Sequence, residues 1–275
     1  MQFISLSIQA NAENSEILVA ELAEVGFDYF EDTPNGFDAF CEEQNYEQAL
    51  VDEIFERYAM LEISVENKAI IEKKNWNEEW EKNFNPVIIN DKCRIRATFH
   101  AYDPQYEYDI LIEPKMSFGT GHHATTASVM RNMFSIDHNQ KRVLDVGCGT
   151  AVLAILAEKL GATEILAFDI DEWSVENAEE NFQLNKSKHI KAVQGNLNQV
   201  APEGLFDIVL ANINRNVLLS EIPAYVQLLA PNGFLIVSGF YTHDEVDITK
   251  CATDTGLTKI QQLSENDWVS VVYKL

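Results

Sequence analysis

Residues Val143 to Leu153 read VLDVGCGTAVL, and this stretch decides the fold class of the chain. An apolar run leads into a turn that contains Gly147 and Gly149, and apolar residues at helical spacing follow from Leu153 onward. A strand, a tight glycine turn and a helix in this order bring backbone N–H groups and a helix N-terminus close to a ligand. The stretch therefore predicts a ligand-binding turn at the carboxyl edge of an α/β sheet.

A carboxylate follows this turn about twenty residues later, in the segment ILAFDID that ends with Asp169 and Asp171. In nucleotide-binding sheets a carboxylate at this spacing holds the hydroxyls of a ribose. The third glycine of a dinucleotide turn would fall at Val152, which disfavours a dehydrogenase. Asp145 instead completes the pattern Asp-x-Gly-x-Gly, which resembles the first motif of the S-adenosylmethionine-dependent methyltransferases. Their usual third glycine is Ala151 here, and alanine is compatible with a helix start. The alternative is a glycine turn that binds no ligand and only allows the helix to pack on the strand.

Strands and helices alternate through the second part of the chain, residues 89–275. The expected strands are 142–146, 164–169, 191–194, 206–212, 233–238, 258–261 and 268–273, and the expected helices between them are 151–160, 172–184 and 221–229. Two further strands (93–99 and 109–113) and a helix (124–134) precede them. This order predicts a doubly wound, seven-stranded α/β sheet of the class I methyltransferase (Rossmann-like) type, with an antiparallel pair at its edge.

The first part of the chain, residues 1–70, has a different element order. The pattern predicts a strand (2–8), a helix (14–25), two strands around the turn Thr33–Gly36 (27–30 and 37–41), a helix (46–58) and a strand (61–65). The order β-α-β-β-α-β is that of a small ferredoxin-like α+β domain. No catalytic constellation occurs in it, so we expect a role in recognition.

Residues 71–88 connect the two parts. Trp76, Trp80 and Phe84 fall on one face of a helix that would end before Pro86. We interpret this segment as a linker helix whose aromatic stripe packs against a neighbouring domain; stacking on a ligand is the alternative.

Composition restricts the compartment. Hydrophobic residues make up 46% of the chain, which excludes wholesale disorder. No apolar stretch reaches the roughly 18 residues of a membrane span, and the start lacks the features of a secretory signal. The four cysteines are scattered without metal-binding spacing, as in a reducing compartment. We expect a cytoplasmic protein without a membrane partner.

The net charge of −24 restricts the partners. Residues 1–75 alone hold 17 acidic and 4 basic side chains. Such a surface disfavours direct contact with nucleic acid, whose phosphates require lysine and arginine. It favours a basic partner, and a surface that only confers solubility is the alternative.

Asn212 is the candidate catalytic residue, because it ends the strand FDIVLAN at the same sheet edge as Gly147 and Asp169. Its amide oxygen can accept a hydrogen bond from an amine and orient the nitrogen lone pair toward a methyl carbon. A turn or helix-capping asparagine is the alternative. No single general base stands out.

The segment from Met116 to Ser128, MSFGTGHHATTAS, predicts a lid over the cofactor, with Thr125 and Thr126 opening a helix. His122 and His123 have no further ligand cluster at suitable spacing, so we expect no metal site. Asn196, after the third strand of the sheet, is a weaker candidate for the adenine.

Five segments, WNEEWEKNF, FGTGHHATT, VLDVGCGTAVL, FDID and VLANI, occur in this order along the chain. Together they resemble the bacterial methyltransferases of protein eleven of the large ribosomal subunit, over nearly the whole length. The lid of that family usually reads FGTGTHPTT, so His122 replaces a threonine and Ala124 a proline, whereas His123, Thr125 and Thr126 match.

The resemblance implies that Thr126, Gly147, Asp169 and Asn212 contact S-adenosylmethionine, and we add Gly149 and Thr125 as cofactor-binding candidates. It also implies methylation of α- and ε-amino groups on a basic ribosomal protein, which the first domain would grip while the linker lets the second domain reach several amines.

Two other functions stay open at the level of sequence. One is methylation of an RNA base or a glutamine amide, although the loop after Asn212 reads Ile213-Asn214-Arg215 and lacks the NPPY pattern of many such enzymes. The other is a non-catalytic module that keeps the cofactor-binding fold.

Overall fold

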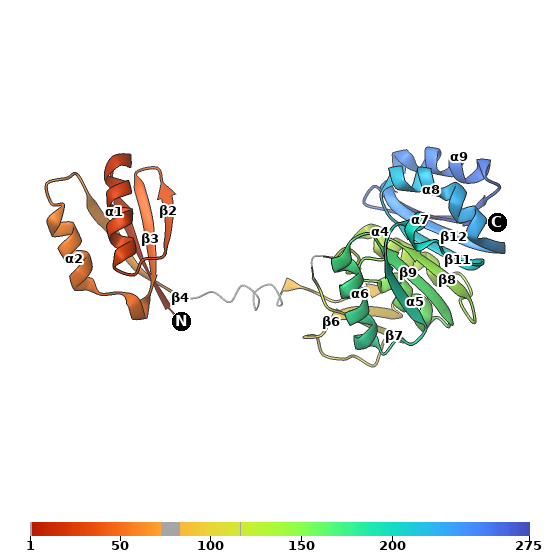
Figure 1. Ribbon diagram of the computed structural model, residues 1–275. Coiled ribbons are helices and arrows are strands. Elements are labelled where there is room, and N and C mark those ends of the chain that lie inside the picture. The colour runs from red at the N-terminus through yellow and green to blue at the C-terminus, as the bar shows by residue number, and fades with distance from the viewer. Residues whose placement is uncertain (1, 73–82, 116) are drawn as a thin grey trace. The chain divides into compact units, whose positions relative to one another are not determined.

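The computed structural model describes residues 2–72, 83–115 and 117–275. It divides into two compact units, Met1–Asn83 and Phe84–Leu275, each with its own core (Figure 1). Trp76 and Trp80, the centre of the expected linker helix, lie outside the described residues. The bounds expected for the linker, 71–88, overlap two strands, because Ile71 and Glu72 end β4 (Ser64–Glu72) and Val87 begins β5 (Val87–Ile89). The expected end of its helix before Pro86 is compatible with the strand at Val87. None of the helices in the described ranges has the length and apolar composition of a membrane span.

The first unit has the predicted β-α-β-β-α-β order. Its elements are β1 (Gln2–Gln9), α1 (Ala12–Glu24), β2 (Tyr29–Thr33), β3 (Gly36–Glu42), α2 (Gln48–Arg57) and β4 (Ser64–Glu72), with a short 3-10 helix η1 (Glu43–Asn45). The strands form an antiparallel sheet in the order β2-β3-β1-β4, as in a ferredoxin-like fold. Alternate residues of β3 (Phe37, Ala39, Cys41) are buried against the helices. The last strand was placed wrongly by the sequence, at 61–65 instead of Ser64–Glu72.

The second unit contains the predicted seven-stranded sheet. Its strands are β8 (Arg142–Val146), β9 (Glu164–Asp169), β10 (Ile190–Gln194), β11 (Phe206–Asn212), β12 (Leu229–Tyr241), β13 (Thr258–Glu265) and β14 (Trp268–Lys274). They follow the order β10-β9-β8-β11-β12-β14-β13. The first five run parallel, and β14 is antiparallel to both β12 and β13. The prediction of a doubly wound sheet with an antiparallel edge pair is confirmed.

Two apolar cores lie on the two faces of this sheet. The helices are α4 (Ala124–Met133), α5 (Val152–Lys159), α6 (Glu172–Asn185), α7 (Leu197–Val200), α8 (Arg215–Leu228) and α9 (Glu245–Asp254), with a 3-10 helix η2 (Thr242–Asp244). Along β8, Val143 belongs to the core under α5, and Leu144 and Val146 belong to the core under α8 and α9. Each such fully buried side chain contributes roughly 1.5–3 kcal/mol, which explains the continuous apolar runs of these strands.

The helix after β11 begins at Arg215, six residues before the position predicted from the sequence. The side chain of Asn214 caps it by accepting a hydrogen bond from the Asn216 N–H at 2.9 Å. Pro223 lies inside this helix and cannot donate to the carbonyl of Leu219. The Cys251 thiol, on the unpredicted helix α9, donates to that carbonyl at 3.6 Å. The proline is therefore tolerated because a neighbouring helix contacts the carbonyl oxygen that it leaves without a helical partner.

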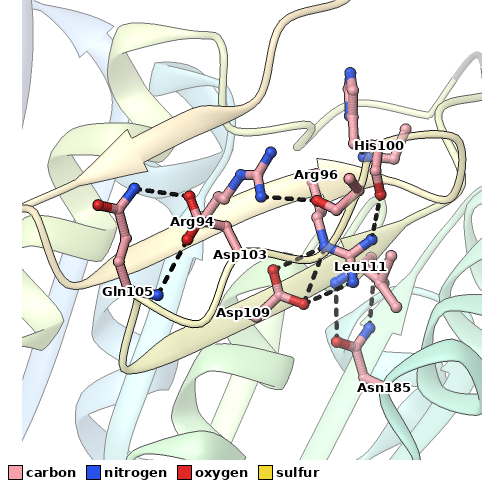
Figure 2. Close-up of polar contacts among 10 residues, drawn as sticks. Arg94, Arg96, His100, Asp103, Gln105, Asp109, Leu111 and Asn185 are labelled. Atoms are coloured by element: carbon pink, nitrogen blue, oxygen red, sulfur yellow. Dashed lines mark hydrogen bonds and ion pairs between the residues drawn. The ribbon is translucent and has the colours of Figure 1, made fainter.

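A small third sheet, in the order β5-β6-β7, belongs to the second unit and packs against α4, α5 and α6. It consists of β5 (Val87–Ile89), β6 (Cys93–Ala97) and β7 (Tyr108–Ile112). Figure 2 shows how the nearly buried Arg96 joins β6 to β7 by a two-pronged ion pair with Asp109, at 2.8 and 2.9 Å. Asn185 of α6 closes the outer edge of β7, since its amide both accepts from the Leu111 N–H (3.0 Å) and donates to the Leu111 carbonyl (2.6 Å) (Figure 2). These contacts attach the small sheet to α6.

Candidate active site

A cavity of about 690 Å³ opens at the carboxyl edge of the seven-stranded sheet, within the size range of small-molecule sites. The strand ends that form it are those of β8, β9, β11 and β12, together with the start of β14. Its described lining is Ser117, Phe118, His123, Thr125, Val146, Gly147, Gly149, Phe168, Asp169, Ile170, Asp171, Ser174, Asn196, Leu197, Asn212, Ile213, Asn214, Val217, Glu221, Gly239 and Trp268. Five of the six predicted site residues therefore line one cavity, and the sixth, Thr126, does not line it.

The glycine turn after β8 has the conformation that its sequence predicted. Gly147 and Gly149 have φ values of +65° and +53°, in the left-handed region that favours glycine. A Cβ atom at Gly149 would lie 2.2 Å from the carbonyl oxygen of Phe118. Because Thr150 also donates its N–H to that oxygen (2.9 Å), the lid segment is bonded directly to the turn. Only a glycine permits this approach.

Ala151, in contrast, is not an ordinary helix-start residue as the sequence suggested. It caps α5 with φ at +59°, again in the left-handed region. For a residue with a Cβ atom this conformation costs roughly 1–2 kcal/mol, which gives a physical reason for glycine at this position in related turns.

The carboxylate of Asp169 is held in place by the backbone of both neighbouring loops. One oxygen accepts the Gly149 N–H at 2.9 Å, and the other accepts the Asp171 N–H at 3.1 Å. Each carboxylate oxygen can accept two hydrogen bonds, so capacity for a ligand's hydroxyl groups remains. The residue lines the cavity and is half-buried.

Asp145, two residues before the turn, has a structural role. It is 1% exposed, and one carboxylate oxygen accepts the Ala154 N–H at 3.1 Å, which joins β8 to the first turn of α5. Burial is the main cause that raises the pKa of Asp145 from 3.8 to about 7, and the nearby charge of Asp169 adds to it.

Asn212 and Thr126 form a buried pair from β11 and α4. The amide nitrogen of Asn212 donates to the Thr126 hydroxyl at 3.2 Å. The amide oxygen of Asn212 is buried and has no hydrogen-bond partner within the described part of the chain. Thr126 is 1% exposed and lies behind Asn212, whereas Thr125 lines the cavity. Thr126 therefore orients the asparagine, and its expected contact with a cofactor stays a prediction.

The two adjacent histidines have separate contacts. His123 caps α4, where its Nδ1 accepts the Thr125 N–H at 3.3 Å. His122 places its Nε2 2.8 Å from the Asn85 carbonyl oxygen, and its ring centroid is 4.6 Å from that of Phe84. No group of three potential metal-ligating side chains occurs among the residues of the described ranges. Asn196 lines the cavity and caps the short helix α7.

The charge of the cavity wall indicates the kind of ligand that fits. The described lining contains the carboxylates of Asp169, Asp171 and Glu221 and neither lysine nor arginine. Such a wall attracts a cationic group and repels an anionic one such as a pyrophosphate. The unpartnered amide oxygen of Asn212 is a second feature that fits a ligand with an N–H donor.

Among the lining residues that the sequence analysis did not single out are Glu221 and Trp268, whereas Phe118 belongs to the predicted lid segment. Glu221 accepts the hydroxyl of the buried Tyr225 at 2.5 Å, one turn along α8. Trp268 comes from β14, far from the glycine turn in sequence. Its only sequence signal is an aromatic residue directly after the turn Asn266–Asp267, where a strand begins.

The chain is similar to one protein family over almost its whole length. Residues 3–275 match the family model described as Ribosomal protein L11 methyltransferase (PrmA). The protein named Ribosomal protein L11 methyltransferase from Phocaeicola vulgatus is 38% identical over 265 residues, which cover 96% of this chain and 94% of that one. The protein of the same name from Porphyromonas gingivalis is 41% identical over 258 residues, which cover 93% and 89%.

Solved structures show the same similarity at the level of fold. The crystal structure titled ribosomal protein L11 methylase, from Lactobacillus delbrueckii subsp. bulgaricus, superposes with a TM-score of 0.65 at 28% identity. The superposition covers 69% of this chain and 98% of the other. A methyltransferase from Pyrococcus furiosus superposes with a TM-score of 0.51 at 19% identity, covering 60% and 88%, which shows a shared fold.

Proposed function

This chain belongs to the family of ribosomal protein L11 methyltransferases, and from that membership we propose that it methylates α- and ε-amino groups of ribosomal protein L11. It is a methyltransferase of the class I α/β type, and its cofactor is S-adenosylmethionine. One observation supports the assignment of the site above all: a cavity without cationic side chains in its described lining, with Asp169 on one side and the unpartnered oxygen of Asn212 on the other.

The residues of the cavity suit the cofactor. We assign the ribose hydroxyls to Asp169, whose oxygens retain capacity to accept hydrogen bonds. Gly147 and Gly149 let the backbone approach the ligand, and Thr125 lies on the same wall. When bound, S-adenosylmethionine supplies an electrophilic methyl carbon on a positively charged sulfur, which the anionic wall favours electrostatically.

Asn212 is the proposed catalytic residue because it can orient the acceptor nitrogen. Its amide oxygen would accept an N–H of the neutral amine, so that the nitrogen lone pair points to the methyl carbon. The hydrogen bond to Thr126 occupies the amide nitrogen, so the buried amide oxygen is the atom left to accept a donor. A lysine with a pKa near 10.4 must first lose its proton, at a cost of about 4–5 kcal/mol at neutral pH.

The ferredoxin-like unit, expected as residues 1–70, is the proposed substrate-recognition domain, and residues 89–275 are the proposed catalytic domain. The many acidic side chains of the ferredoxin-like unit suit a basic ribosomal protein and disfavour direct contact with RNA. A ribosomal substrate also places the proposed reaction in the cytoplasm.

The test is transfer of labelled methyl groups by the purified chain to purified L11 or to naked ribosomal RNA. We expect label in L11 only, with intact L11 heavier by whole methyl masses, and none with the Asn212→Ala variant. Label in the RNA, or an unchanged mass of L11 in the presence of bound cofactor, would overturn the proposal.

A further inference from the structure

An aromatic row borders the cavity from Phe118, beside the glycine turn, to Trp268 at the start of β14. We infer that Phe118, His123 and Trp268 form the entrance for the acceptor amine, and that their rings bind it as an ammonium or methylammonium ion. This inference rests on the proposed function and concerns the acceptor side of the same site.

Sheet topology defines the two ends of the site. Along the carboxyl edge the strands follow the order β9-β8-β11-β12-β14. Asp169 ends β9, Asn212 ends β11 opposite Ser238 of β12, and Trp268 begins β14 opposite Tyr241. With about 4.8 Å between neighbouring strands, Asn212 is two strand spacings from Asp169 and two from the strand of Trp268. A cofactor with its ribose at Asp169 therefore leaves the Trp268 end to the acceptor.

The rings at this end form a continuous row of contacts from the lid to η2. Ring centroids are 5.3 Å apart for Phe118–His123, 4.8 Å for His123–Trp268 and 4.1 Å for the stacked pair Trp268–Tyr241, and Tyr241 stacks on His243 at 5.5 Å. Phe118 is 54% exposed and Tyr241 is 42% exposed. His123 and Trp268 between them are half-buried. A partly exposed aromatic patch at the mouth of a cavity is typical of a binding surface.

The chemistry of these rings suits every methylation state of the acceptor. Aromatic rings attract ammonium ions by cation–π interaction, and methylated ammonium ions bind in the same way. Each added methyl group removes one N–H donor from the amine, until no N–H is left to bind the amide oxygen of Asn212. The aromatic rings can still bind the methylated ammonium group. The entrance would therefore keep a partly methylated amine near the site for another transfer.

The first experiment compares Trp268→Leu, Trp268→Phe and Tyr102→Leu in the full chain, with L11 as substrate. Tyr102 is the matched control, because it is 65% exposed and does not line the cavity. For Trp268→Leu we expect unchanged affinity for S-adenosylmethionine, a KM for L11 about tenfold higher, and products shifted toward single methyl groups. Trp268→Phe should recover most of the loss, and Tyr102→Leu should equal the parent. An unchanged KM and product distribution for Trp268→Leu would overturn the inference.

Phe118→Ala is the second variant, because truncation of this half-exposed ring leaves its backbone hydrogen bond to Thr150 intact. It should raise the KM for L11 in the same direction, and a KM equal to that of the parent would count against the entrance. Titration with tetramethylammonium chloride, followed by the NMR signal of the Trp268 indole N–H, needs no protein substrate. A shift that sodium chloride does not produce supports the entrance even if L11 is not methylated. An unmoved signal overturns it.

Discussion

Replacement of Asp145 by asparagine should remove a large pH dependence from the stability of the methyltransferase unit. Burial holds the pKa of this carboxyl at about 7 in the folded chain, against 3.8 when it is exposed. The folded state therefore binds a proton that the unfolded state has already lost. Because the pKa of Asp145 is higher in the folded state, the contribution of its proton to the free energy of unfolding is fully present below pH 4. That contribution is lost as the pH rises through 7.

The size of the effect follows from the two pKa values. At pH 4.5 ionisation of Asp145 in the unfolded chain favours unfolding by about 1 kcal/mol, and at pH 8 by about 4 kcal/mol. The difference, about 3 kcal/mol, is a large fraction of the stability of an ordinary domain. Asparagine does not titrate and can still accept the Ala154 N–H. The free-energy cost of burying its amide group is therefore the same at every pH.

The assay is urea unfolding of the full chain and of Asp145→Asn at pH 4.5, 6 and 8. Because the carboxylates that do not interact with Asp145 titrate equally in both proteins, the difference between the two unfolding free energies reports on Asp145 and its coupling to Asp169. We expect that difference to move in favour of the variant by about 3 kcal/mol between pH 4.5 and 8. A difference that stays constant across the three pH values would refute a neutral, buried Asp145.

Three further predictions concern the turn and its supports. Asp169→Ala should weaken binding of S-adenosylmethionine roughly 100-fold or more, since two hydrogen bonds to a charged acceptor are lost; calorimetry measures this, and circular dichroism should be unchanged. Ala151→Gly should stabilise the unit by about 0.5–1 kcal/mol in thermal unfolding, because glycine adopts a positive φ without strain. Gly149→Ala should destabilise the unit by more than about 2 kcal/mol and abolish cofactor binding, because the new Cβ would lie 2.2 Å from a carbonyl oxygen. Gly256→Ala, with φ at +97° and nothing within 4 Å of a new Cβ, is the control that retains binding. Asn181→Leu leaves a buried N–H and a buried carbonyl unsatisfied and should cost about 2–6 kcal/mol; a loss below 1 kcal/mol would contradict this.

The sequence predicts best those parts of the fold in which local pattern and tertiary environment agree. The strands around Leu144 and Leu210 are buried on both faces, so their apolar runs could be read without knowledge of their neighbours. The turn at Gly147 is equally local, because its conformation requires glycine wherever the segment is placed. The positions of Asp169 and Asn212 followed from the rule that parallel strands end at one edge.

Features that depend on distant contacts could not be predicted. The start of α8 at Arg215 was not predicted, and only the Cys251 contact from α9 explains how Pro223 fits in the middle of this helix. The orientation of Thr126 behind Asn212 depends on packing between α4 and β11, 86 residues apart in sequence. Trp268 likewise reaches the cavity only because β14 inserts between β12 and β13.

The strand order itself explains why a site forms here from segments so far apart. From β8 the chain adds β9 and β10 on one side, and then returns to add β11 and β12 on the other. The loops that leave β8 and β11 therefore diverge to opposite faces, and a crevice opens between them. The same reversal places the carboxylate of Asp169 on one flank and the later strands, with Trp268, on the other. A donor and an acceptor that must meet in line can thus enter from opposite ends, with Asn212 at the point where they meet.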